Sequence, residues 1–151
     1  MGGLVIRSAL PLLSEYKNLM NTFVTLSTPH LGIDLSTNGI RKAGLWLISK
    51  ISKSLTMREL NMEDSKNLNQ TYLYSLSLFE GLEWFKTVIL CGSGQDSYAP
   101  YESSLLNFSG YKETNSEQSK CYLEMANNIK MKLRNCKVIR LDVNFNIEAM
   151  Y

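Results

Sequence analysis

The stretch KTVILCGSGQDSYAP, residues 86–100, decides the fold of this 151-residue chain. An apolar run rich in β-branched residues leads directly into a loop of glycine and polar residues. Such a run, bounded by turn residues, is typical of a strand that is buried on both faces of a parallel sheet. The loop then lies at the carboxyl edge of the sheet, where open α/β folds place their functional sites.

Two further strands are predicted on either side of this one in the chain. The segment TFVTLS, residues 22–27, is apolar and β-branched without alternation, which again predicts a strand buried on both faces. The segment KVIRLDV, residues 137–143, alternates apolar with charged side chains and predicts a last strand. Helical patterns separate the three segments, so the chain is predicted to form an α/β fold with a parallel sheet of about three strands and right-handed crossovers.

The helices are predicted from apolar spacing and from their end signals. A short helix over residues 4 to about 10 is expected to be ended or kinked by Pro11, and further helices are expected over about 39–60 and 71–79. Thr114 and Glu117 form a capping box at the start of another helix. Its expected buried face consists of Tyr122, Met125, Ala126, Ile129 and Leu133.

Composition narrows the functional class. A net charge of +2 and apolar and charged fractions of 44% and 20% are those of an ordinary globular domain. No basic stripe is interleaved with aromatic residues, so we expect no nucleic-acid partner. The sequence has no transmembrane run, and Arg7 and Pro11 interrupt any signal peptide, so a cytoplasmic location is expected. Three cysteines and one histidine predict reduced, buried thiols and neither a metal nor a cofactor.

Three segments in order resemble the lipase-like serine esterase family of the α/β-hydrolase superfamily. MGGLVIRSAL, residues 1–10, is similar to the segment after the serine in the family's G-H-S-[ML]-G-[GN]-L-[IV]-I-R-S elbow. FVTLSTPHLG, residues 23–32, is similar to the next strand and its T-P-H-x-G turn. FKTVILCGSGQDSYAPYESS, residues 85–104, is similar to the strand and loop that carry the catalytic acid. The resemblance implies a partial α/β-hydrolase domain over residues 1–151, with a helical cap-like insert at about 33–80.

The resemblance also implies a reaction and its residues. The family hydrolyses carboxylic esters of lipids or other acyl compounds through an acyl-enzyme on serine. Met1 takes the position whose backbone N–H contributes to the oxyanion hole, Gly2 closes the elbow, Gly3 comes next, and Asp96 is the acid. No complete G-x-S-x-G is present, and Ser8 lies inside the expected helix. With neither nucleophile nor base, the chain alone is predicted to be inactive.

Several alternatives remain open for individual residues. Asp96 is also explained as a loop aspartate that bonds its own backbone, and Asp34 is a weaker rival for the acid. His30 precedes Asp96, whereas the family order is Ser, Asp, His, so His30 is expected to be a structural residue near the cleft or a cap hinge. Arg7 is predicted either to pair with an acidic residue near the elbow or to face solvent.

Two other functions compete with the esterase. The runner-up is a non-catalytic α/β module that binds a protein or lipid partner. The strands at 22–27 and 87–91 lack the charges or prolines that protect the open edge of such a module, which favours a piece of a larger sheet. A third possibility, a small hydrolase built on Asp96 and His30, has no placed nucleophile, because Cys91 is expected to pack inside its strand. The sequence leaves the ester and the oligomeric state open.

Overall fold

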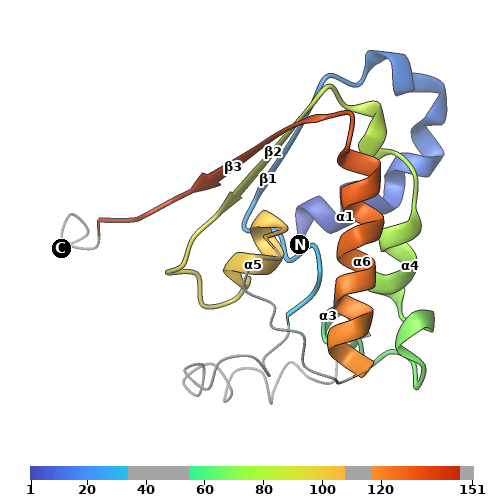
Figure 1. The fold of residues 1–151 in the computed structure, drawn as a ribbon, viewed down its shortest axis with the longest axis vertical. Helices are drawn as coiled ribbons and strands as arrows, with labels where there is room; N and C mark the ends of the chain where they lie inside the picture. The colour runs from blue at the N-terminus through green and yellow to red at the C-terminus, as the bar shows by residue number, and fades with distance from the viewer. Residues whose placement is uncertain (34–54, 108–116, 147–151) are drawn as a thin grey trace.

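The structure is a computed structural model that describes residues 1–33, 55–107 and 117–146. Its centre is a sheet of three parallel strands in the order β1 (Thr22–Leu26), β2 (Thr87–Gly92) and β3 (Lys137–Asp142), seen in Figure 1. Ile89 of β2 pairs with Val24 on one side and with Ile139 on the other. The predicted three-stranded parallel sheet is confirmed.

Helices occupy every connection between the strands. α1 (Gly2–Ala9) and η1 (Leu10–Leu19) precede β1. α1 ends two residues before Pro11, close to the predicted end, and the chain continues as a 3-10 helix. α3 (Leu55–Leu60), η2 (Leu68–Gln70), α4 (Tyr72–Leu78) and η3 (Leu82–Trp84) lie between β1 and β2. α5 (Tyr101–Leu105) and α6 (Glu117–Leu133) lie between β2 and β3. Asp34, the Thr114 cap and most of the helix predicted over 39–60 fall outside the described residues.

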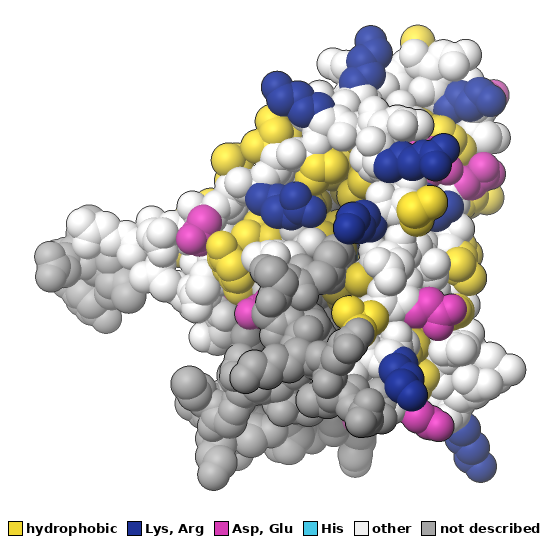
Figure 2. Space-filling model, viewed as in Figure 1, with side chains coloured by type: hydrophobic (Ala, Val, Ile, Leu, Met, Phe, Trp, Pro, Cys, Tyr) yellow, Lys and Arg dark blue, Asp and Glu magenta, His cyan; other side chains and the backbone are white. Residues whose placement is uncertain are grey.

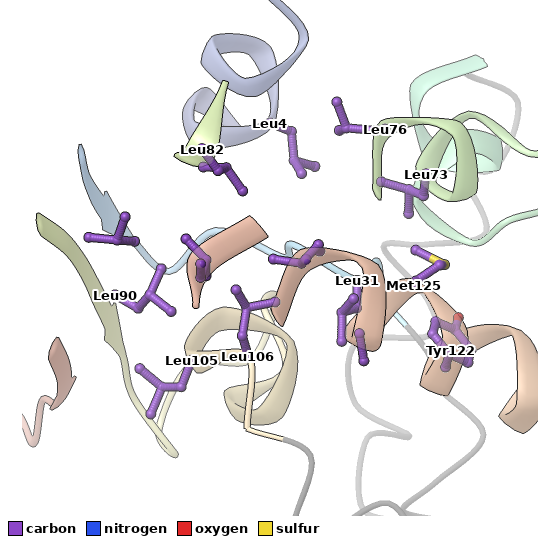
Figure 3. Close-up of a cluster of buried hydrophobic side chains, with 14 of the residues drawn as sticks. Leu4, Leu31, Leu73, Leu76, Leu82, Leu90, Leu105, Leu106, Tyr122 and Met125 are labelled. Atoms are coloured by element: carbon purple, nitrogen blue, oxygen red, sulfur yellow. The ribbon is translucent and has the colours of Figure 1, made fainter. Parts of the chain in front are cut away.

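One face of the sheet packs against the helices. Phe23, Thr25, Val88 and Leu90 are buried on this face, and Figure 1 shows α1, α4 and α6 on the same side of the sheet. Figure 3 shows the resulting apolar cluster. Leu90 of β2 lies on one side of the cluster, and side chains from the helices form the rest of it. The predicted apolar face of α6 is confirmed, since all five of its residues are buried: Tyr122, Met125, Ala126, Ile129 and Leu133.

The opposite face of the sheet corrects the prediction that β1 is buried on both sides. Val24 and Leu26 are 51% and 74% exposed, and Leu141 of β3 is 45% exposed. Cys91 on the same face is buried, and Ile89 is half-buried. Figure 2 shows further hydrophobic side chains on the molecular surface, over the strands and beside α6. An apolar run predicts which side chains a strand could bury. In the described part of the chain, however, no layer covers this face of the sheet.

All three cysteines are free thiols, with Cys91 and Cys121 buried and Cys136 half-buried. Burial raises the pKa of Cys121 to about 11. Among the residues that the structure describes, no helix combines the length and the apolar character that crossing a membrane requires.

Candidate functional site

The start of α1 is pressed against the end of β1. A Cβ on Gly3 would lie 2.6 Å from Oγ1 of Thr28 and 2.9 Å from Cγ2 of Thr25, both of them buried side chains. The neighbouring Gly2 faces open space, with nothing within 4 Å of a Cβ there. The close approach of helix and strand therefore depends on Gly3, and it holds Met1, a half-exposed residue, near the carboxyl end of β1.

Arg7 joins three segments that are distant in the sequence. Its guanidinium is buried, donates from Nη1 to the His30 carbonyl at 3.2 Å, and donates from Nη2 to the Leu76 carbonyl at 3.1 Å. These bonds connect α1, the turn after β1 and α4. The expectation that Arg7 faces solvent is wrong. The positive charge is instead buried, and two backbone carbonyl oxygens accept hydrogen bonds from it.

The imidazole of His30 is held from both sides. Arg7 can only donate, so His30 Nδ1, 3.3 Å from Arg7 Nη1, must accept and carries no proton. The proton is then assigned to Nε2, which donates to Oγ1 of Thr25 at 3.1 Å. Burial, together with the smaller effect of the Arg7 charge, lowers the pKa of His30 well below 6.5. Burial also lowers the pKa of Arg7 to about 10, which leaves the guanidinium charged at neutral pH.

Asp96 lies in the loop after β2 and is half-buried. Its Oδ1 accepts hydrogen bonds from the backbone N–H groups of Tyr98 at 2.7 Å and Ala99 at 3.0 Å. Its own N–H donates to the Ser93 carbonyl at 3.2 Å. The carboxylate thus bonds the backbone of its own loop, which is the alternative interpretation of Asp96 given above. The same bonds hold the carboxylate in one orientation at the carboxyl edge of the sheet.

Two residues that sequence reasoning missed connect the loops at this edge. The hydroxyl of Ser103 on α5 accepts from the Leu31 N–H and donates to the Gly32 carbonyl, both at 2.9 Å. The amide of Gln95 accepts from the Phe145 N–H at 2.6 Å and donates to the Phe145 carbonyl at 3.1 Å. The first residue joins the T-P-H-x-G turn to α5, and the second joins the Asp96 loop to the chain after β3. Ser103 lies within the stretch 85–104 that resembles the family, and Gln95 lies beside Asp96 in the same stretch.

The glycine of the T-P-H-x-G turn is constrained by its surroundings. Gly32 has a φ of +90°, and a Cβ there would lie 2.4 Å from the backbone oxygen of Leu60. The turn after β1 is therefore seated against the end of α3 as well as on α5. Within the described ranges, no group of three or more His, Cys, Asp or Glu side chains could hold a metal ion.

The buried neutral state of His30 makes the stability of the fold depend on pH. Its folded-state pKa lies below the unfolded value of 6.5, so on acidification the unfolded chain takes up the proton first. Below pH 6.5 the free energy of unfolding is expected to fall by about 1.4 kcal/mol per pH unit from this group alone. Urea unfolding at pH 7.5, 6.0 and 5.0 measures it, with His30→Gln as the comparison. Equal pH slopes for the two proteins would contradict the prediction.

A single family of known proteins matches the part of the chain that holds most of this site. The family model described as "Putative serine esterase (DUF676)" matches residues 1–120. That span includes the start of α1, the turn that holds His30, and the Asp96 loop. No solved structure matches the chain.

Proposed function

Because the chain belongs to this serine esterase family, we propose that it supplies the oxyanion-hole backbone and the acid of an esterase site that cleaves carboxylic esters. The Met1 N–H, at the start of α1, would stabilise the negative charge on the carbonyl oxygen of the ester. Asp96 would orient the histidine base and stabilise its protonated form while serine forms and releases the acyl-enzyme. Residues 33–80 would form a helical cap over the site.

One observation carries this proposal: each of the three motif segments is fixed to a neighbouring segment at or near the carboxyl ends of the strands. The start of α1 lies against Thr28, the turn after β1 is bonded to Ser103, and the Asp96 loop is bonded to Phe145. Phe145 belongs to the chain just beyond β3, the region in which the family order places the histidine. The acid loop is thus directly attached to the segment from which the base would come.

Two members of the triad are not in this sequence. It contains no G-x-S-x-G, and its one histidine is buried with both ring nitrogens bonded to Arg7 and Thr25. Because loss of a triad member costs several orders of magnitude in rate, the isolated chain is expected to have no esterase activity. A serine-reactive fluorophosphonate probe should leave it unlabelled at a concentration that labels a control serine esterase completely. Stoichiometric labelling of this chain would contradict the proposal.

The proposal is tested first by sequencing the native transcript through both ends of the reading frame. An in-frame Gly-His-Ser directly before Met1, together with a histidine after Tyr151, would support it and give the complete enzyme for kinetics. An in-frame stop codon before Met1 and a terminus at Tyr151 would reject it as a present-day activity.

A second candidate function is suggested by the exposed face of the sheet. Val24, Leu26 and Leu141 form an apolar surface that a binding module would cover with a protein or lipid partner. The same transcript result distinguishes the two functions, because a partner-binding module needs neither the serine nor the histidine. The remaining test is whether Leu26→Lys abolishes self-association or vesicle binding of the chain.

A further inference from the structure

A cavity lies beside the start of α1. It has a volume of about 330 Å³, opens to solvent, and is lined by Met1 and by residues of α1, α3 and α4. Met1 and Val5 line it and are 50% and 64% exposed, so they stand at its mouth. Leu4, Leu60 and Leu73 line it and are at least 95% buried, so they form its floor. Its size falls at the lower end of small-molecule sites.

The floor of this cavity belongs to the main core. Figure 3 shows Leu4 of α1 and Leu73 of α4 among the labelled side chains of the buried cluster. The cavity is therefore a recess in a packed apolar surface, between α1 and the helices α3 and α4.

Four polar side chains line the cavity, those of Ser8, Thr56, Glu59 and Tyr72, and two of them are bonded to each other. The hydroxyl of Ser8 donates to the Leu4 carbonyl at 2.8 Å and shares a short hydrogen bond with the hydroxyl of Tyr72. A ligand in this space would therefore meet mostly apolar side chains, and the bonded pair of Ser8 and Tyr72 needs no new partner. Such a lining favours a hydrocarbon chain over a sugar or a phosphate.

Two other cavities differ in their chemistry. One, of about 490 Å³, is lined by Glu83, Lys132 and Arg134 among others, and another, of about 480 Å³, by Lys66, Glu117 and Lys120 among others. Their walls carry charges of both signs, and neither cavity is lined by a residue of α1. The recess beside Met1 thus combines an apolar floor with a position next to the oxyanion backbone.

We propose that this recess binds the acyl chain of the ester, with the ester carbonyl at the Met1 N–H and the hydrocarbon against Leu60 and Leu73. This inference rests on the proposed function for the position of the carbonyl. Glu59 also lines the recess. The volume of the recess limits the acyl chain to a short or medium length.

Binding to the chain itself tests the proposal without catalysis. The probes are methyl acetate, methyl butanoate, methyl hexanoate and methyl octanoate, titrated into the full chain and followed by NMR of its methyl groups. The dissociation constant is expected to fall up to about fourfold per added methylene until the recess is filled. The methyl signals of Val5, Leu60 and Leu73 should shift.

A pair of variants locates the binding. Val5→Trp, at a largely exposed position at the mouth, should weaken methyl octanoate binding at least about tenfold, since several methylenes lose their contacts. Leu19→Trp makes the same kind of change on η1, at a position that is 79% exposed and does not line the recess, and should leave binding unchanged. The thermal unfolding midpoint of each variant controls for loss of fold.

The outcomes separate this inference from the esterase proposal. Absence of binding, equal affinity for all four esters, or shifts at Val24 and Leu26 in place of Val5 would overturn the acyl recess and leave the transcript test unaffected. Length-dependent binding at Val5 with a transcript that lacks serine and histidine would keep the recess as a lipid-binding site and reject the enzyme.

Discussion

Replacing Asp96 by asparagine is expected to lower kcat of the complete esterase by about 10³–10⁴-fold. The loop should survive the change, because the bonds from the Tyr98 and Ala99 N–H groups go to Oδ1, and an asparagine amide oxygen can accept both. Only the negative charge that would stabilise the histidine is lost. The measurement is kcat and KM for a short-chain ester, using the enzyme translated from the full native transcript.

A matched variant separates the catalytic role from the structural one. Asp142→Asn makes the same change of charge on exposed β3 and should leave kcat unchanged. If Asp96 serves only as a loop residue, Asp96→Asn will behave like Asp142→Asn, and the acid must be sought elsewhere. Unchanged urea midpoints for both variants would show that the fold is intact.

Alanine at Gly3 is expected to destabilise the fold by about 2–4 kcal/mol, whereas alanine at Gly2 should stabilise it by about 0.4–1 kcal/mol. The Gly3 Cβ would push into the side chains of Thr28 and Thr25, both of them buried, and would strain the Thr25 bond to His30. The Gly2 Cβ meets nothing, so there the loss of backbone freedom in the unfolded chain dominates.

Urea midpoints of the two single variants test this pair, since they lie in the same turn of the same helix and make the same chemical change. Equal midpoints would show that α1 does not depend on close contact with the end of β1. A large loss at Gly2 would point instead to a backbone requirement at that position.

Much of the fold can be predicted from local pattern. The run at 86–92, the strand at 22–27 and the helix face that contains Met125 are visible because periodicity and β-branching report which side chains a segment can bury. Whether a layer is present to bury them is not a local property. For this reason Val24 and Leu26 were expected to be buried and are exposed.

The site is less readable than the fold. The motif residues Gly3, His30 and Asp96 stand out because their spacing resembles a known family, but their partners come from distant parts of the chain. Ser103 bonds to Leu31 across 72 positions, and Arg7 bonds to Leu76 across 69. No spacing rule relates such pairs, since the crossovers that bring them together are set by the whole sheet.

The order of strands and helices, the parallel sheet, and the family to which the chain belongs were determined by the sequence alone, because these depend on side-chain type and local spacing. Only the tertiary structure decided which face of the sheet is covered. It also decided that Arg7 is a buried cation that donates hydrogen bonds to carbonyl oxygens, and that His30 is a neutral ring hydrogen-bonded at both nitrogens. These depend on desolvation and on contacts between remote segments, and both exist only after the chain has folded.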